Sequence, residues 1–469
     1  MHEDQPATAV EDSGDEVAGP AKHSGGASEP RGRRLGVWAG LLLVAAGVLG
    51  WAQAAAPEYS PLDEHTHAGS AWDIAHGTVP AAGSPVPEEV LQDWACSGQF
   101  NVDLPPCGAD AELWQYPGSG QNYNWAHPPL YYMITGVAAR AIDGAIPAVT
   151  FVGAARALSI VWIYAGMVLL YTALRRWRVD WRIASATAAA VPLMPHIMHA
   201  GTIVTNDAPA VLGGAAALLV LGRVLLDHKT QWWLPVILAG ALASTKVLNA
   251  LAMLSVAGVF LVFAVARKHL SRLDLPSSRR LVSLGLGIVG AVTLVFLTWR
   301  VLQSRRGDPN WRNPIGGTNT DPLEGGPGKE WLSTSLDGLD ISRGSFVDVV
   351  LREATMTVWV AAATVILIAG VWAALVALSP RDPRWSLALA TAGGLLAFPT
   401  VVQIQTYLAG GGQTYFPAVS TRYGMTMIPL ILACWAFLLD RRRLVRVSGA
   451  VTALGLLLVV LTLAGLSPQ

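Results

Sequence analysis

The feature that most constrains this chain is a series of long apolar runs, separated by short polar segments with clusters of arginine and lysine. Runs such as residues 35–56, 151–174 and 281–301 are close to the roughly 20 residues that a helix needs to cross a bilayer. Only 14% of the residues are charged and 52% are hydrophobic, with a mean hydropathy of +0.43. Soluble domains carry roughly 25% charged residues. The pattern therefore predicts an all-α fold, a polytopic membrane helical bundle, and argues against a soluble enzyme.

The basic clusters orient the predicted spans, because arginine and lysine favour the cytoplasmic side of a membrane. Residues 31–34 place the start of the first span in the cytoplasm, although a cleaved signal peptide is the alternative interpretation. The stretch 130–145 is predicted to be an interfacial or re-entrant helix, since a crossing there would put the basic cluster 175–178 outside. About eleven spans then alternate consistently: 35–56, 151–174, 183–200, 208–226, 232–244, 248–266, 281–301, 355–378, 387–406, 423–439 and 445–466.

This topology divides the chain into three parts. Residues 1–30 are polar and rich in small residues, which predicts a disordered cytoplasmic tail. Residues 31–440 form the transmembrane domain, with large outer loops at 57–128 and 303–350, and residues 441–469 hold a last span. Cys96 and Cys107 share the first outer loop, where an oxidising compartment would allow them to pair. The 32 basic and 32 acidic side chains balance, so no basic excess indicates a nucleic-acid partner.

The scarce ionisable groups near the spans gather at their outer ends, and Asp63 and Glu64 follow the first span directly. With His65 and His67 close by, the pair could act as a general base or ligate a metal. Acidic residues after a proline are equally typical of a helix N-terminus, and loop histidines are usually solvated. The spacing alone therefore leaves both interpretations open.

Further along, a His-Pro-Pro-Leu-Tyr-Tyr segment at 127–132 closes the first outer loop, and its tyrosines suit the membrane interface. Lys246 interrupts two apolar runs, which favours a role with lipid phosphate but also fits a simple hairpin. Asp207 could instead cap the helix that follows it. In the second outer loop, Trp311 and Trp331 could contact a sugar, or the loop could be a mobile surface segment.

Taken together, the motifs resemble the GT-C superfamily of polyprenyl-phosphate-sugar glycosyltransferases. The resemblance spans about residues 35–439 and rests on the order and sidedness of short motifs rather than on any one of them. These motifs are Pro61-Leu62-Asp63-Glu64, His127-Pro128-Pro129-Leu130-Tyr131-Tyr132, Arg156, Asn206-Asp207, Ala243-Ser244-Thr245-Lys246 and Thr421-Arg422-Tyr423.

The resemblance implies an inverting transfer of a sugar from a polyprenyl-phosphate carrier to a hydroxyl of a cell-envelope glycan, lipid or protein. The reaction would take place on the outer face of a bacterial cytoplasmic membrane. Asp63, or alternatively Glu64, would be the catalytic base, and a divalent cation (Mg²⁺ or Mn²⁺) held by Asp63, Glu64 and His67 is an option. The implied donor-phosphate residues are Lys246, Arg156 and Arg422, and the implied substrate-binding residues are His127, Tyr131, Asn206 and Asp207.

Each arginine has a simpler interpretation, because Arg156 and Arg422 could extend to lipid headgroups. Two other functions also fit a bundle of many spans with an outer polar region: a transporter or flippase for a lipid-linked substrate, and a non-catalytic scaffold for envelope assembly. No phosphate-binding loop or dinucleotide fingerprint indicates a cytosolic nucleotide-sugar donor.

Overall fold

The computed structural model of the chain describes most of the predicted transmembrane domain. It covers residues 29–312 except 61, 62, 271 and 272, and then 314, 320–323, 328, 354–409, 411–416, 421–441, 445, 446 and 450. Most of the predicted tail 1–30, of the outer loop 303–350 and of the segment 441–469 lies outside the described residues, Trp331 included.

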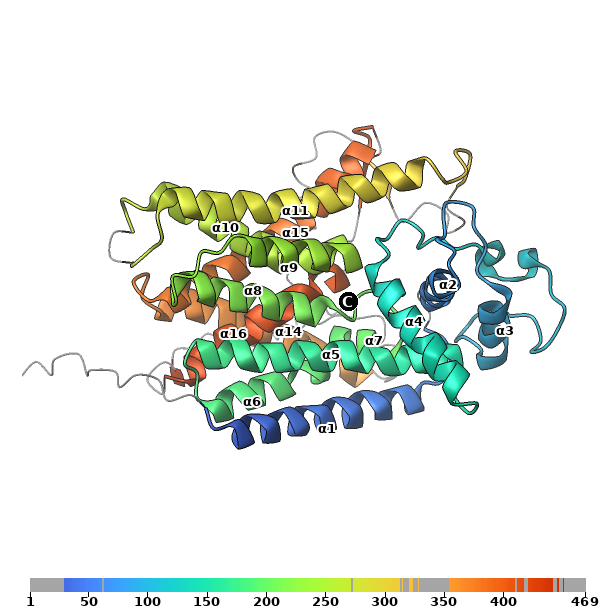
Figure 1. Cartoon of the computed structure of the whole chain (residues 1–469), viewed down its shortest axis with the longest axis horizontal. Coiled ribbons are helices and arrows are strands. Elements are labelled where there is room, and N and C mark those ends of the chain that lie inside the picture. Colours follow the sequence, from blue (N-terminus) through green and yellow to red (C-terminus); the bar gives the residue numbers. More distant parts are fainter. Residues whose placement is uncertain are drawn as a thin grey trace, which may run out of the picture.

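Long apolar helices lie side by side and make the body of the molecule (Figure 1). Six segments of the described chain are long and apolar enough to cross a membrane: α1 (Arg31–Ala55), α5 (Phe151–Arg176), Val247–Ala266 with η4 (Val247–Ala250) and α10 (Leu251–Ala266), α11 (Ser278–Ser304), Pro383–Ile404 within α15 (Pro383–Ala409), and Arg422–Leu439 with most of η5 (Thr421–Met427) and α16 (Ile428–Leu439). Shorter apolar helices are α8 (Ala210–Leu225), α9 (Trp233–Thr245) and the segment Thr364–Ala377 of α14 (Ala354–Ala377). The predicted all-α membrane bundle is confirmed, and the number of eleven spans stays a prediction.

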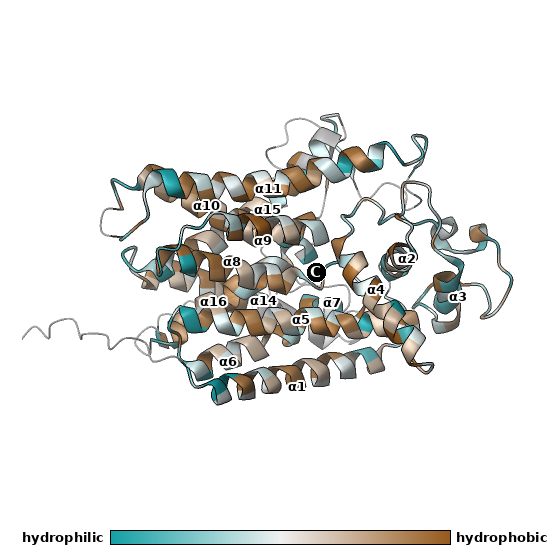
Figure 2. Cartoon of the chain, viewed as in Figure 1, coloured by the Kyte–Doolittle hydropathy of each residue, from teal (hydrophilic) through white to brown (hydrophobic). Residues whose placement is uncertain are grey.

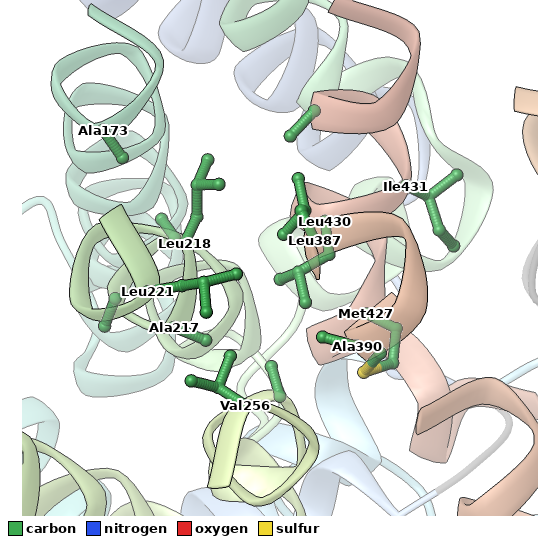
Figure 3. Packing of buried hydrophobic residues seen from close by; sticks show 14 of the residues in the cluster. Ala173, Ala217, Leu218, Leu221, Val256, Leu387, Ala390, Met427, Leu430 and Ile431 are labelled. Atoms are coloured by element: carbon green, nitrogen blue, oxygen red, sulfur yellow. The ribbon is translucent and has the colours of Figure 1, made fainter. Parts of the chain in front are cut away.

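The bundle core consists of aliphatic side chains from helices far apart in the sequence. Leu218 and Leu221 of α8 face Val256 of α10, Leu387 of α15 and Leu430 of α16, and all five are buried (Figure 3). Hydrophilic residues gather instead at the two ends of the bundle (Figure 2). In a membrane the apolar outer surface would contact lipid, so the interior is held by close packing of helix on helix.

One predicted span is not a continuous helix. Residues 183–200 were expected to cross as a unit, but the chain forms α6 (Trp181–Ala189), the 3₁₀ turn η3 (Val191–Leu193) and α7 (Pro195–Thr202). Pro192 and Pro195 explain the break, because proline removes a backbone donor and clashes with the preceding turn of a helix. The broken helix packs against α1 and α5.

At one end of the bundle, the first polar loop folds into a small helical layer, called here the α2–α4 end (Figure 1). It contains α2 (Glu64–Ala75), α3 (Glu88–Ser97), the 3₁₀ turns η1 (Leu113–Gln115) and η2 (Pro117–Gly120), and α4 (Leu130–Ala145). A disulfide joins Cys96 and Cys107 within this layer. Two short antiparallel strands, β1 (Asp321–Pro322) and β2 (Thr414–Tyr415), join two distant parts of the chain.

Helix α4 agrees with the prediction of a helix that does not span. It is 16 residues long and lies obliquely across the end of the bundle, packed against α2 and α5 (Figure 1). Gly136 permits this contact, because a Cβ there would overlap the backbone of Ala71 in α2. The tyrosines at its start, Tyr131 and Tyr132, are fully buried, so the expectation that they lie among lipid headgroups was wrong.

Candidate functional site

Asp63 lies at the junction of the α2–α4 end and the bundle. It immediately precedes α2, but its side chain caps no backbone N–H of that helix. The carboxylate instead faces the Arg422 guanidinium, with Nη1–Oδ1 and Nη2–Oδ2 distances of 3.4 and 3.2 Å. On its other side, Nε2 of His67 lies 3.6 Å from Oδ2. A helix does begin at this place, as the helix N-terminus interpretation expected, but the Asp63 side chain turns toward charged groups and caps no backbone N–H.

The electrostatic setting keeps Asp63 ionised. Burial acts to raise its pKa, but Arg422 and then His67 outweigh burial and hold the pKa of this carboxyl well below its usual range. An opposite charge within hydrogen-bonding range favours the charged form of a carboxyl group. Asp63 is thus ionised at physiological pH, and its side chain retains 14% of its exposure.

Glu64 has a different environment, although it is the next residue. It is fully buried, and its oxygens accept hydrogen bonds from Nε and Nη2 of Arg156 at 2.7 and 2.9 Å. The backbone N–H groups of Ser60 and Val204 donate to the same carboxylate at 2.8 and 3.0 Å. Four donors occupy the two oxygens, so Glu64 joins α2, α5 and the segment after α7.

Arg156 is equally engaged. It also donates to the backbone carbonyls of Pro57 and Glu58 at 2.8 and 2.9 Å, and its guanidinium lies 5.4 Å from the centre of the Tyr59 ring. Every hydrogen bond of its guanidinium among the described residues ties α5 to the chain around α2. The structure therefore places this predicted donor-phosphate residue in a structural ion pair, apart from Asp63 and Arg422.

A second buried ion pair joins Asp207 and Lys246. Nζ of Lys246 lies 2.5 Å from Oδ1 of Asp207, and both side chains are less than one-tenth exposed. Lys246 is one extended residue that separates α9 from η4, and its ammonium turns inward to Asp207. Burial raises the pKa of Asp207, but Lys246 and Arg422 outweigh this effect and lower it.

Tyr423 connects the two ion pairs. Its ring centre lies 5.3 Å from Nζ of Lys246 and 5.7 Å from Cζ of Arg422. Both cations therefore contact one aromatic ring, an arrangement that favours positive charge. Two carboxylates and two cations from four separate chain segments thus meet around Tyr423.

Two glycines of α8 allow these segments to approach. A Cβ at Gly213 would overlap the carbonyl oxygen of Asn249 in η4, and one at Gly214 would overlap the carbonyl oxygen of Thr426 in η5. Because η4 follows Lys246 and η5 contains Arg422, close backbone contact with α8 sets the positions of both cations. Glycine is the residue that such a close approach requires.

Hydrogen bonds also connect α2 to α4 and to the residues before α8. Nδ1 of His67 lies 2.7 Å from the Tyr132 hydroxyl, and Nδ2 of Asn206 lies 3.1 Å from the same hydroxyl. The Tyr131 hydroxyl accepts from the backbone N–H of Thr205 at 3.1 Å. Tyr131 and Asn206, two predicted substrate-binding residues, therefore support the framework of the site in this structure.

The histidines of α2 are not solvated loop residues, contrary to the simpler interpretation. His65 and His67 are both buried; His65 stacks on Trp94 with ring centres 3.9 Å apart. The ring of His127, 5.9 Å from that of His67, is half-buried. Burial, and next the positive charge of Lys246, lower the pKa of His127 to about 3, so its ring is neutral at physiological pH and can accept a hydrogen bond.

The residues considered for a divalent cation do not form a ligand set in this structure. Asp63 and His67 face each other, but Glu64 points into Arg156. In the described part of the chain, no group of three His, Cys, Asp or Glu side chains is arranged to hold a metal ion.

The structure thus brings together Asp63, His67, Arg422, Asp207 and Lys246, and it sets Glu64 and Arg156 apart as an anchor. The sequence interpretation gave no site role to Tyr132, Tyr423 or Asn249. Tyr423 follows Arg422 directly, and this position could have indicated a role in the site. Asn249 could not be singled out, because it resembles any polar residue near the start of a helix. An ionised carboxylate beside two cations can accept a proton from a hydroxyl while the cations stabilise an anionic leaving group.

Part of the chain is similar to a known protein family. Residues 127–299 match the family described as dolichyl-phosphate-mannose-protein mannosyltransferase. The matched segment contains Asp207 and Lys246, whereas Asp63 and Arg422 lie outside it. The match confirms the resemblance to the GT-C superfamily and supports a membrane glycosyltransferase that uses a polyprenyl-phosphate-linked sugar. No curated protein matches the chain.

Proposed function

We propose that the protein transfers a sugar from a polyprenyl-phosphate carrier to a hydroxyl of a cell-envelope glycan, lipid or protein. We place the reaction on the outer face of a bacterial cytoplasmic membrane, with Asp63 as the base. The observation that carries this proposal is the ion-pair cluster: Asp63 is held anionic by Arg422, and Asp207–Lys246 adjoins it around Tyr423. The placement of the basic clusters at the opposite end of the bundle supports the orientation.

In the proposed reaction, the acceptor oxygen attacks the anomeric carbon as its proton passes to the Asp63 carboxylate. The bond between the anomeric carbon and the phosphate oxygen breaks, and its electron pair leaves with the lipid phosphate. Because this is a single displacement, it inverts the configuration at the anomeric carbon. A phosphate leaves without being protonated, so the remaining task is to stabilise its charge.

Lys246 and Arg422 are the proposed donor-phosphate residues. The planar guanidinium suits two-point contact with phosphate, whereas the ammonium acts as a point charge. Each cation is neutralised by its own carboxylate in this structure. A bound phosphate would therefore compete with Asp207 for Lys246 and with Asp63 for Arg422, and it would leave Asp63 a stronger base than in the free protein.

Asp63 is favoured over Glu64 as the base because of their partners. Glu64 accepts four hydrogen bonds and is fully buried, so it has little remaining capacity to take a proton. Neutral His127 is the proposed contact for a substrate hydroxyl, since it lies beside His67 and is only half-buried.

The test uses purified protein in lipid nanodiscs with a polyprenyl-phosphate sugar and a membrane-envelope acceptor fraction. Asp63→Asn should abolish transfer, and Lys246→Met should raise the donor KM and lower kcat. Asp103→Asn and Lys229→Met are matched controls, since these exposed residues make the same charge changes away from the cluster.

Transfer that persists in both site variants would refute the proposed site. Movement of labelled lipid-linked sugar between leaflets, with the glycosidic bond intact and equally fast in Asp63→Asn, would favour the transporter alternative. Envelope assembly that needs the protein but tolerates both variants would favour a scaffold.

A further inference from the structure

We propose that His67 is a positioning residue that orients Asp63 for proton transfer, and that Tyr132 and Asn206 fix which of its ring nitrogens carries the proton. This inference rests on the proposed function for its kinetic consequence, but its structural content can be measured without turnover. It assigns a shared task to three residues, one each from α2, α4 and the segment before α8.

The two oxygens of Asp63 are not equivalent. Oδ2 accepts from Nη2 of Arg422 at 3.2 Å and faces Nε2 of His67 at 3.6 Å. Among the described residues, Oδ1 faces only Nη1 of Arg422, at the longer distance of 3.4 Å. Oδ1 is thus the oxygen that accepts fewer hydrogen bonds. We assign it as the atom that takes the proton of the acceptor hydroxyl.

The hydrogen-bond partners then determine the state of His67, one link at a time. An ionised carboxylate at Oδ2 favours a donor opposite it, so we place the proton on Nε2; at 3.6 Å this preference is weak, and the Tyr132 contact is needed to fix it. The proposal takes the ring as neutral, with one donor and one acceptor nitrogen, so Nδ1 accepts a hydrogen bond from the Tyr132 hydroxyl at 2.7 Å. The Tyr132 oxygen in turn accepts from Nδ2 of Asn206 at 3.1 Å.

Burial makes this order of donors and acceptors costly to reverse. His67, Tyr132 and Asn206 are each about 1% exposed or less, so water does not replace a lost partner. In the reversed order, an unprotonated Nε2 would face the Asp63 carboxylate, and two acceptors would oppose each other. Such an arrangement is unfavourable in a site with little water.

Asn206 also connects this chain of hydrogen bonds to the donor-phosphate residues. Its backbone carbonyl accepts from Nδ2 of Asn249 at 2.8 Å, and the next residue, Asp207, holds Lys246. The same short segment therefore sets the His67 tautomer on one side and the position of Lys246 on the other.

Two variants with opposite geometry separate the two contacts of His67. In His67→Gln, the amide nitrogen can approach the place of Nε2 and keep a donor for Asp63. In His67→Asn, the shorter amide reaches the place of Nδ1 and keeps only the Tyr132 contact. We expect His67→Asn to lower kcat by roughly 10²-fold, the effect of a reacting group misplaced by about 1 Å.

The expected pattern distinguishes positioning from a general structural role. His67→Gln should recover most of the kcat lost in His67→Asn, and the donor KM should be the same in both. Tyr132→Phe should lower kcat less than His67→Asn does. Without the Tyr132 hydroxyl, His67 adopts both tautomers, and the one with its proton on Nε2 still orients Asp63. Equal kcat in the two His67 variants, or a loss confined to KM, would overturn the inference.

The second measurement does not depend on activity. Solid-state ¹⁵N NMR of histidine-labelled protein in nanodiscs, with the His67 signal assigned from its loss in His67→Gln, should show a proton on Nε2 and none on Nδ1. In Tyr132→Phe, the signals should show both tautomers. A proton on Nδ1 alone, or on both nitrogens, in the wild-type protein would refute the inference even where the transferase activity is as proposed. Retained transfer in Asp63→Asn would instead refute the proposed function.

Discussion

The buried ion pair between Glu64 and Arg156 gives the sharpest test of how the site is built. The two residues are 92 positions apart in sequence, and they fasten α2 to α5 at a place where Glu64 is fully buried. In Glu64→Gln, one carboxylate oxygen becomes an amide nitrogen. That nitrogen then faces an N–H donor of Ser60, Val204 or Arg156, and the Arg156 charge loses its counter-ion.

The expected loss of stability in Glu64→Gln follows from the buried environment of the ion pair. Removing one partner of a buried ion pair typically costs about 3–5 kcal/mol, and Glu64 also loses at least one of two backbone hydrogen bonds. We therefore expect Glu64→Gln to lower the free energy of unfolding by about 4 kcal/mol. Asp63→Asn should change it much less, because Asp63 retains 14% exposure and accepts longer hydrogen bonds.

The assay is thermal unfolding in detergent, followed by tryptophan fluorescence, beside transfer activity measured well below the unfolding midpoint. The double variant Glu64→Gln/Arg156→Met should recover part of the lost stability, since it removes the unpaired charge. Glu64→Gln that is as stable as the wild type, or that loses activity while fully folded, would refute the assignment of Glu64 as an anchor.

Three further predictions concern the α2–α4 end and α8. Burial, and next the charge of Glu89, raise the pKa of the Asp73 carboxyl to about 7. In the folded protein this carboxyl therefore keeps a proton that it loses above about pH 4 in the unfolded chain. The stability of the fold consequently falls as the pH rises from about 4 to 7. Asp73→Asn should accordingly raise the unfolding midpoint far more at pH 8 than at pH 5, and equal shifts would contradict this. The disulfide joins Cys96 and Cys107, which are 11 residues apart. Its reduction should lower the free energy of unfolding by about 3 kcal/mol, as measured by unfolding with and without dithiothreitol. An unchanged unfolding midpoint would speak against a structural disulfide. Gly214→Ala should displace η5 and reduce transfer more than it reduces α-helix content by circular dichroism, because a Cβ there overlaps η5 backbone; wild-type activity would refute that close approach.

The apolar runs alone determined that the chain forms a membrane bundle, because each run long enough to span must satisfy its backbone hydrogen bonds internally as a helix. The positive-inside rule also singled out residues 130–145 as a helix that does not cross, and α4 lies across the end of the bundle (Figure 1). These predictions depend only on composition and on the placement of charge along the chain, and both can be read from a single sequence.

Which of two adjacent acids faces the site was decided only by the tertiary structure. Asp63 and Glu64 have the same charge and neighbouring positions, but their partners, Arg422 and Arg156, come from segments 359 and 92 residues away. The burial of Tyr132 likewise depends on long-range packing. A sequence specifies which residues can carry charge or donate hydrogen bonds, and the folded backbone decides which of them meet, since a hydrogen bond forms only between atoms a few ångströms apart.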